Sequence, residues 1–379
     1  MDIYSTSGDR RRQTRSRVFR CLYDSAEPLS KQELAARLSL SLPTVYQNIN
    51  ELLEMGLIEY TGPQASRGGR PAMQMRVVAG ARYAVGIFVT EEKVHFALTD
   101  LMCQALDYRD ILYEHGLFTD SFNRQLVNEL ELFLDINKVD REKLLGVGVC
   151  LSGIIDQDSS NIFYAPTLGL RNVSLHPLLD AIPYPTHAEN DANCGGFAEW
   201  FIHGGDNCIA FLSLTGGVGG ALFVNGDKYL GTNRRSGEFG HMCVEKGGLP
   251  CSCGKRGCLE AYCSSSRLST ELGISLEEFF RLLDQGDERV QPIWSDYLEH
   301  LAVGIHNARM VLDCRVVLGG TMIEHIAPHM PRLRSLVAQL DPFFSEGEAE
   351  YLSLGHFSGK GPLLGAAFYF VRDFLESNL

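Results

Sequence analysis

A glycine-rich segment in the second half of the chain, residues 237–260, restricts the possible folds more than any other part of the sequence. It contains one histidine and three closely spaced cysteines, which are His241, Cys251, Cys253 and Cys258. Three thiolates and one imidazole complete a tetrahedral Zn²⁺ site and leave no position for water, so the pattern predicts a structural zinc ion. The alternative interpretation is a loop whose cysteines are buried or incidental and hold no metal.

The other cysteines of the chain show no comparable spacing. The sequence has 11 cysteines in all, and we expect the eight other than Cys251, Cys253 and Cys258, including Cys243 within the segment, to fill core positions. The N-terminus is polar and basic, without the apolar stretch of a secretory signal, and no apolar run is long enough to span a bilayer. We therefore expect a cytoplasmic protein, in which cysteines serve as metal ligands or core residues rather than as a disulfide framework.

The net charge of −13 is distributed unevenly along the chain. Residues 1–73 carry ten Lys and Arg against eight Asp and Glu, which leaves 24 against 39 in the remainder. Six arginines lie between Arg10 and Arg20. A small basic head on an acidic body suits contact with a polyanion, although a short basic run is also common on a solvated surface.

The first 75 residues show the pattern of three short helices followed by two strands. Apolar residues at helical spacing predict a first helix over residues 14–24, and the pair Ser30 and Glu33 forms a capping box at the start of a second helix. Ser41 caps a third helix that Gly56 ends. Strand-like segments follow at residues 57–61 and 73–77, and the Gly- and Pro-rich segment between them outlines a hairpin wing.

This arrangement predicts a winged helix-turn-helix domain that binds double-stranded DNA, with the third helix in the major groove. We expect the residues that contact bases to be the polar ones on the outer face of that helix, namely Thr44, Tyr46, Gln47 and Asn48. Arg67 and Arg70 of the wing, with the arginines of the first helix, are expected to contact phosphates. The alternative is a helical protein-interaction module with a solvated polar face.

The remainder of the chain alternates β-type apolar runs with helical stretches, which indicates an α/β body. The runs that we expect to be strands lie at residues 84–89, 94–101, 144–151, 208–214, 219–226 and 315–320. We expect a first lobe over residues 76–190, joined by the C-terminal residues 360–379. A second lobe over residues 191–359 would hold the zinc site.

The motif Gly237-Glu238-Phe239-Gly240-His241, followed by Cys251-x-Cys253-Gly254-x-x-Gly257-Cys258-Leu259-Glu260, resembles the signature of the ROK family of transcriptional repressors and sugar kinases. The resemblance runs from about residue 14 to the C-terminus. It implies a two-lobed, actin-like and hexokinase-like (ribonuclease H-like) body with a sugar between the lobes, and a zinc site. It also implies at least a homodimer. The kinase members of the family lack the N-terminal DNA-binding domain.

The same resemblance implies which residues hold the sugar: Asn190, Asp191, Glu238, His241 and Glu260. In the kinases, the position of Asp191 holds the general base. Converging carboxylates and carboxamides suit sugar hydroxyls, which are both donors and acceptors. An Asn-Asp pair is also a common turn, and we expect the preceding Glu189 to lie at the surface of a strand or loop.

An active kinase of this family needs a phosphate-binding hairpin resembling V-D-I-G-G-T-K. Here Phe88 stands where the Asp that organises Mg²⁺ belongs, and Thr90 and Glu91 replace both glycines. Loss of such charge stabilisation typically costs several kcal/mol of transition-state energy. A second glycine-rich loop, residues 215–221, is altered less. We therefore expect that the protein is not an enzyme and has no catalytic residues.

These observations predict a sugar-responsive, DNA-binding transcriptional regulator, most simply a repressor of carbohydrate-metabolism genes. Its body would bind a sugar or sugar phosphate without phosphorylating it, and the sequence leaves open whether the effector releases or recruits DNA. One alternative is an active sugar kinase that uses ATP, with an autoregulatory DNA-binding head. Another is a sensor that acts through a protein partner.

Overall fold

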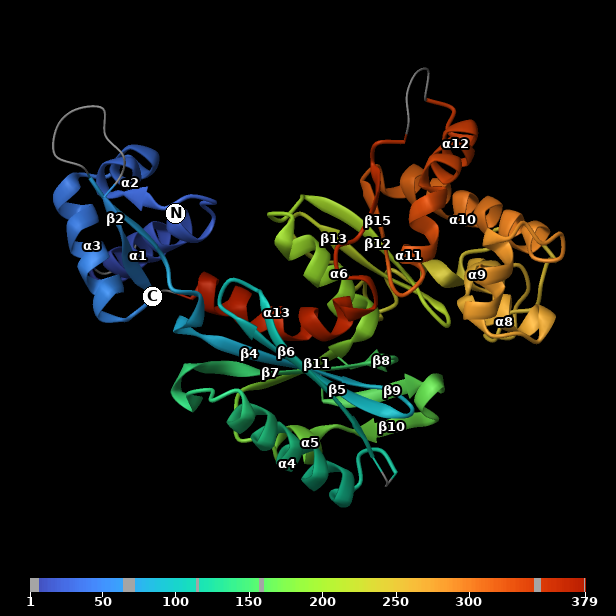
Figure 1. Cartoon of the computed structure of the whole chain (residues 1–379), viewed down its shortest axis with the longest axis horizontal. Coiled ribbons are helices and arrows are strands. Elements are labelled where there is room, and N and C mark those ends of the chain that lie inside the picture. The colour runs from blue at the N-terminus through green and yellow to red at the C-terminus, as the bar shows by residue number, and fades with distance from the viewer. Residues whose placement is uncertain (1–6, 64–71, 114–115, 157–159, 344–348, 378) are drawn as a thin grey trace.

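The computed structural model describes residues 7–63, 72–113, 116–156, 160–343, 349–377 and 379. Figure 1 shows a small head, coloured blue, beside a body that contains two separate five-stranded sheets. The expected fold class, a helix-turn-helix head followed by a two-lobed α/β body, is confirmed by this arrangement.

The head contains three helices, α1 (Ser7–Tyr23), α2 (Lys31–Leu38) and α3 (Leu42–Glu54), and the strands β1 (Leu29–Ser30), β2 (Ile58–Pro63) and β3 (Met73–Val77). The strands form a sheet in the order β1-β3-β2. Both halves of the expected capping box at Ser30 and Glu33 are present, and the Ser41 side chain caps α3. Helix α1 begins at Ser7 rather than at residue 14. The sequence did not reveal its first turns because they lack an apolar face. Arg11 and Arg15 of this helix form ion pairs with Glu51 of α3.

The first sheet of the body has the strand order β11-β7-β4-β5-β6. Its strands are β4 (Tyr83–Val89), β5 (Lys93–Asp100), β6 (Ala105–Leu112), β7 (Leu144–Leu151) and β11 (Thr186–Asn190). Helices α4 (Asp120–Ile136) and α5 (His176–Leu179) lie on one side of this sheet, next to a small sheet of β8 (Ile154–Ile155), β9 (Asn161–Ala165) and β10 (Leu170–Ser174). The edge strand β6 and the small sheet were not anticipated from the sequence.

The second sheet has the order β14-β13-β12-β15-β16. Its strands are β12 (Cys208–Leu214), β13 (Val218–Val224), β14 (Asp227–Lys228), β15 (Arg315–Gly319) and β16 (Leu352–Leu354). The helices that follow the glycine-rich loop and flank this sheet are α7 (Leu259–Cys263), α8 (Ser265–Leu272), α9 (Leu276–Asp284), α10 (Gln291–Leu312), α11 (Ile323–Ile326) and α12 (Met330–Leu340). Their apolar faces form one core with β12 and β15.

Two helices, α6 (Asp191–Ile202) and α13 (Gly361–Glu376), pack against each other between the two sheets (Figure 1). Their contact is close because a Cβ atom on Gly365 would lie 1.9 Å from the carbonyl oxygen of Cys194. On the other side, a Cβ atom on Gly148 of β7 would lie 2.0 Å from the carbonyl oxygen of Ala366. Glycine at these positions therefore lets α13 lie directly against both α6 and the first sheet.

The C-terminal end of α13 also contacts the head. The rings of Phe19 and Phe374 meet edge to face at 6.3 Å between centroids. The Arg15 Nε atom donates to the Leu379 carbonyl oxygen at 2.7 Å, and the Leu379 amide donates to the Ser16 hydroxyl at 3.0 Å. The head and α13 thus share one apolar core.

Among the described helices, none combines the length and apolar character needed to cross a bilayer.

Candidate functional site

The four side chains of the Cys/His pattern lie together in the structure. The ligand atoms of His241, Cys251, Cys253 and Cys258 are all within 4.8 Å of one another. The Cys251 sulfur lies 3.8 Å from His241 Nδ1, and the sulfurs of Cys253 and Cys258 are 3.7 Å apart. Tetrahedral coordination with zinc–sulfur bonds of about 2.3 Å separates ligand sulfurs by about 3.8 Å, so the cluster fits a metal of this kind.

Tight backbone turns bring these ligands together. Gly254 and Gly257 adopt φ angles of +83° and +79°, in the left-handed region that favours glycine. A Cβ atom on Gly257 would lie 1.7 Å from the carbonyl oxygen of Glu245, so only glycine fits there. The backbone of Lys255 hydrogen-bonds Cys253 and lowers the pKa of this thiol. The cluster is therefore able to hold a metal within a loop that the backbone itself shapes.

Asn190 and Asp191 lie where β11 ends and α6 begins. The Asn190 side chain caps α6 by accepting from the Asn193 amide at 3.0 Å, and its Nδ2 atom donates to the Gly153 carbonyl oxygen at 2.9 Å. The Ser152 hydroxyl donates to Asp191 Oδ2 at 2.5 Å. Burial raises the pKa of Asp191, while the bond from Ser152 acts in the opposite direction. The carboxylate is thereby fixed at the N-terminal end of the interlobe helix α6.

Glu238 and Glu260 flank the residues of the Cys/His cluster in the sequence. Glu260 Oε1 accepts from the Ser252 hydroxyl at 2.9 Å, and Oε2 accepts from the Val218 amide at 3.2 Å. Desolvation raises the pKa of Glu238; nearby His241 lowers it, and the charges of Glu260 and Asp191 raise it further. The charges of Asp191, His241 and Glu260, three of the other four expected sugar-binding residues, therefore act on the Glu238 carboxyl group.

A small hollow of about 30 Å³ lies between the end of β11 and the loop that contains Glu238. Asn190, Glu238 and Glu189 are among its lining residues. The expectation that Glu189 lies at the surface is wrong, because its side chain is buried and paired with Lys228 and Arg234. Sequence reasoning missed this residue because its two cationic partners are distant in the chain.

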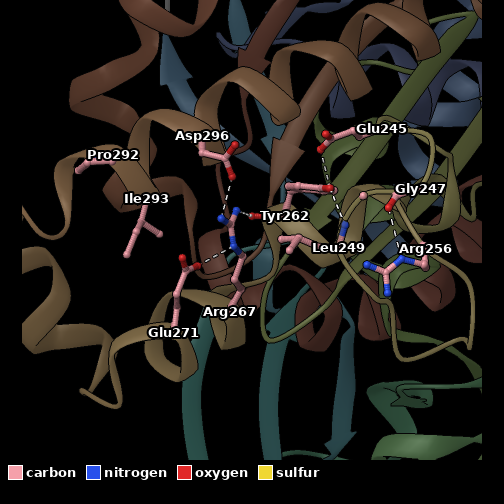
Figure 2. A pocket seen from close by; sticks show the side chains of 11 residues that line it. Glu245, Gly247, Leu249, Arg256, Tyr262, Arg267, Glu271, Pro292, Ile293 and Asp296 are labelled. Carbon is pink, nitrogen blue, oxygen red and sulfur yellow. Dashed lines mark hydrogen bonds and ion pairs between the residues drawn. The ribbon is translucent and has the colours of Figure 1, made fainter.

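A larger pocket of about 440 Å³ is lined in part by Glu245, Leu249 and Arg256 of the glycine-rich loop and by none of the expected sugar-binding residues (Figure 2). Its polar side chains already bond one another. Arg267 pairs with Asp296 at 2.7 Å and with Glu271 at 3.0 Å, and the Tyr262 hydroxyl donates to Glu245 at 2.6 Å (Figure 2). We therefore assign the candidate sugar site to the residues around Asp191.

The hairpin between β4 and β5 bonds to its own backbone. Both the amide and the hydroxyl of Thr90 donate to the Lys93 carbonyl oxygen at 2.9 Å, and the Tyr113 hydroxyl donates to the Thr90 carbonyl oxygen at 3.0 Å. Phe88 packs its ring 5.9 Å from that of His95. A Cβ atom on Gly86 would lie 1.9 Å from the Leu363 carbonyl oxygen, so the packing of α13 explains this glycine without any nucleotide.

Packing also explains one glycine in each of two further loops, residues 215–221 and the Gly319-Gly320 turn at the end of β15. A Cβ atom on Gly220 would lie 2.4 Å from the ring of Phe239. One on Gly320, whose φ is +86°, would lie 2.3 Å from the Leu214 carbonyl oxygen. Gly220 and Gly320 are therefore required by the fold and give no independent indication that a phosphate binds.

The outer face of α3 differs from the expectation at one position. Tyr46 and Gln47 are exposed and Thr44 is half-buried, but Asn48 is only 3 % exposed, and its Nδ2 atom donates to the Thr44 carbonyl oxygen at 2.7 Å. Asn48 therefore cannot contact bases as predicted, because it lies on the apolar stripe of α3. The Lys31 ammonium lies 3.3 Å from the centre of the Tyr46 ring.

The expected phosphate-binding arginines fall into three groups. Arg67 and Arg70 lie outside the described residues. Arg11 and Arg15 of α1 both form ion pairs with Glu51, at 2.5 Å for Arg15, so a single carboxylate within the head holds both guanidinium groups and offsets part of their charge. Arg12 and Arg17 are exposed and remain candidates for phosphate contact.

Comparison with known proteins agrees with this architecture. The ROK family profile matches residues 84–373, and a helix-turn-helix domain profile matches residues 13–61. The xylose repressor of Bacillus subtilis (strain 168) is 26 % identical over 360 residues, which are 92 % of each chain. The DNA-binding transcriptional dual regulator NagC of Escherichia coli (strain K12) is 26 % identical over 279 residues, covering 72 % of this chain and 66 % of NagC.

Solved structures show the same fold. A ROK family transcriptional regulator described as a homologue of the E. coli MLC protein has a TM-score of 0.76 at 19 % identity and covers 97 % of both chains. A ROK family glucokinase from Streptomyces griseus, in complex with glucose and AMPPNP, has a TM-score of 0.63 at 19 % identity and covers 76 % of this chain and 98 % of its own. Since the family profile spans most of the chain, the protein belongs to the ROK family and carries a helix-turn-helix domain at its N-terminus.

Proposed function

We propose that this protein is a sugar-responsive transcriptional repressor whose kinase-like body binds its effector without phosphorylating it. The observation that carries this proposal is a continuous path of contacts from the candidate sugar site to α3, the helix expected to enter the major groove and called the reader helix below. The similarity to named repressors along nearly the whole chain supports it.

In the sugar site, Asp191 and Asn190 would accept and donate hydrogen bonds at one side of the sugar, with Glu238, Glu260 and His241 on the other. Bidentate contacts between carboxylates and neighbouring hydroxyls discriminate between epimers, because a missing or inverted hydroxyl leaves a buried polar group unpaired. Ser152 keeps Asp191 in position through its 2.5 Å bond. The effector class that this set of residues suits is a monosaccharide or a sugar phosphate.

His241, Cys251, Cys253 and Cys258 would hold a structural Zn²⁺ ion, the metal that three thiolates and one imidazole favour. The ion would cross-link the two ends of the loop. Glu260 bonds Ser252 beside the cluster, so a rigid loop would keep this carboxylate aimed at the sugar. In this proposal His241 serves the metal and also shapes the sugar site next to it.

The path to the head runs through the two interlobe helices. Asp191 begins α6, which contacts α13 at Cys194 and Gly365. The last residue after α13, Leu379, bonds Arg15 of α1, and Arg15 pairs with Glu51 of the reader helix α3. Movement of one lobe relative to the other on sugar binding would therefore shift the reader helix, which is the coupling between two sites that allostery requires.

Phosphoryl transfer is disfavoured by the hairpin at Phe88. Glu91 and Glu92 are exposed at its tip, where they would repel a triphosphate, and no carboxylate occupies the position of Phe88 to organise Mg²⁺. The amide of Thr90 is already bonded to Lys93. We infer that the protein binds its sugar and does not turn it over.

A repressor of this design would act as a homodimer, with two reader helices about one duplex turn apart on a pseudo-palindromic operator. Thr44, Tyr46 and Gln47 would face bases, whereas Arg12, Arg17, Arg67 and Arg70 would contact phosphates. Action on an operator would place the protein in the cytoplasm.

The test combines binding and turnover on the full chain. Thermal-shift screening of monosaccharides, amino sugars and sugar phosphates should find a selective binder, since a ligand of the folded state raises the melting temperature. That ligand should change the affinity for DNA from the gene's own promoter. A coupled assay with ATP, Mg²⁺ and the same sugar should give no sugar phosphate. Product formation would instead establish an active kinase, and a promoter fragment that never binds would refute the repressor.

A further inference from the structure

A second cluster of potential metal ligands lies at the other end of α6, far along this helix from Asp191. Its members are Glu199 and His203, one helical turn apart on α6, and His356 in the loop between β16 and α13. One ligand atom from each side chain lies within 4.8 Å of the other two. None of these residues belongs to the Cys/His cluster or to the candidate sugar site.

The three side chains converge without satisfying one another. His203 Nε2 lies 3.9 Å from Glu199 Oε2, and His356 Nδ1 lies 3.6 Å from the same oxygen, so both separations exceed a hydrogen bond. The His203 Nε2 atom is buried and has no hydrogen-bond partner among the described residues. An unpaired buried nitrogen is costly, so its presence here calls for a ligand.

Glu199 is held in place by the backbone of the opposite segment. Its Oε1 atom accepts from the amides of His356 at 2.7 Å and Phe357 at 3.0 Å, while Oε2 accepts only from the His356 amide, at 2.9 Å. A Cβ atom on Gly355 would lie 2.5 Å from Oε1, so glycine allows this approach. The side chain is 2 % exposed, and its Oε2 atom is the one whose distances to the two imidazole nitrogens are 3.9 and 3.6 Å.

We propose that Glu199, His203 and His356 form a second metal site, which takes a divalent transition-metal ion such as Zn²⁺ or Ni²⁺. Ligand atoms around a tetrahedral Zn²⁺ ion with bonds of about 2.0 to 2.1 Å lie about 3.4 Å apart. The two separations from Glu199, 3.6 and 3.9 Å, need only a small contraction, and the ligand nitrogens of the two histidines lie within 4.8 Å of each other. Two imidazoles with one carboxylate favour these ions over Mg²⁺ and Ca²⁺, which prefer oxygen ligands.

The surrounding charges permit a bound cation. The buried carboxylate of Glu199 offsets part of the charge of the ion. The positive charge of Arg315 acts on His203, and this guanidinium is paired with Asp206 at 3.2 Å. His356 is 58 % exposed, which gives the ion a path from solvent and leaves room for water as a further ligand.

The site would join the end of α6 to the segment that leads into α13. These are the two helices between the lobes, so an ion at this point would tie them together independently of the sugar. This inference concerns different residues from those of the proposed sugar sensor and does not depend on it.

The test is a Ni²⁺ titration of the tag-free full-length protein by calorimetry, with Trp200 fluorescence as a second signal. Trp200 lies between Glu199 and His203 in the sequence, so a paramagnetic ion should quench it. We expect one saturable equivalent of Ni²⁺ per chain. His203→Ala and His356→Ala should each weaken binding at least about tenfold, because removal of a ligand costs no less than removal of an outer-shell partner.

Two controls separate this site from other metal sites. His176→Ala, which removes an exposed histidine of α5, should leave the Ni²⁺ affinity unchanged, and so should Cys253→Ser, which disrupts the Cys/His cluster. Absence of saturable binding, or equal binding by the wild type and His356→Ala, would overturn the proposal. His356→Ala is decisive even if His203→Ala fails to fold, because the side chain of His356 is largely exposed.

Discussion

The β4–β5 hairpin and the loop at residues 237–260 use their polar groups in opposite ways. In the hairpin, the polar groups of the tip bond one another, and Gly86 of β4 is explained by the packing of α13. In the loop, four ligand atoms and the carboxylates of Glu238 and Glu260 converge without a packing reason. The comparison teaches that unexplained polar side chains indicate function better than glycines do.

The largest effect on sugar affinity should follow from removing the charge of Asp191 in the candidate sugar site. Asp191→Asn should weaken binding of the effector sugar about 100-fold, because a hydrogen bond to a charged, buried group is lost. Operator affinity without sugar should stay unchanged. Calorimetry with the sugar and gel-shift titration with the operator measure the two quantities. Sugar binding equal to that of the wild type would place the sugar elsewhere.

A smaller effect should follow from disrupting the metal cluster. Cys253→Ser should lose bound zinc and weaken sugar binding by about tenfold, since the loop that positions Glu260 is no longer cross-linked. Cys243→Ser is the matched control, because this exposed cysteine lies in the same loop but outside the cluster. Metal analysis and calorimetry test both variants. Full sugar affinity in a metal-free Cys253→Ser protein would contradict the scaffold role.

Gln47 and Asn48, which are adjacent on α3, test DNA recognition independently of the hairpin and of the loop at residues 237–260. Gln47→Ala should cost about 1 kcal/mol of operator discrimination and leave folding intact, because the side chain is exposed. Asn48→Ala should instead lower the free energy of unfolding by about 1 kcal/mol, since its bond to the Thr44 carbonyl is buried. Gel shifts and urea denaturation distinguish the two results. Loss of operator discrimination in Asn48→Ala but not in Gln47→Ala would show that α3 is rotated on DNA.

The link between the sugar side and the head can be weakened at one contact. Arg15→Ala removes the bonds to Leu379 and Glu51 and should reduce the effect of sugar on operator affinity by about twofold. Arg12→Ala, at an exposed position of the same helix, should weaken binding to all DNA sequences but leave the sugar effect unchanged. Operator titrations with and without sugar measure both. An unaltered response in Arg15→Ala would exclude this route.

The smallest effect should come from the hairpin. Phe88→Asp restores one carboxylate, yet we expect no sugar phosphate to form, because Glu91 and Glu92 remain and the tip stays bonded to itself. Sugar affinity should change by less than about twofold, because the half-buried Phe88 packs against His95 and is not among the expected sugar-binding residues. A coupled ATP assay checks the first point and calorimetry the second. Turnover in this variant would mean that a single residue separates the sensor from a kinase.

The expected strands of the body and the helices of the head were confirmed because apolar periodicity and caps such as Ser30 with Glu33 are local signals. The Cys/His pattern was equally local, since the four residues lie in one loop. The strand β6 was missed, because its solvent-facing edge position leaves little apolar pattern. Asn48 was misplaced because a polar residue on the apolar stripe of a helix resembles an exposed one until its partner is known.

The sequence by itself determined most of the order of the elements, the family pattern and the residues of the Cys/His cluster, since each depends on neighbours within a few turns of the chain. Only the tertiary structure decided that Arg15 faces Glu51 and the C-terminus rather than DNA, that Glu189 is buried, and that His356 meets Glu199 and His203. These contacts join segments far apart in sequence. Their partners are set by how α6 and α13 pack between the sheets, and no local pattern encodes that packing.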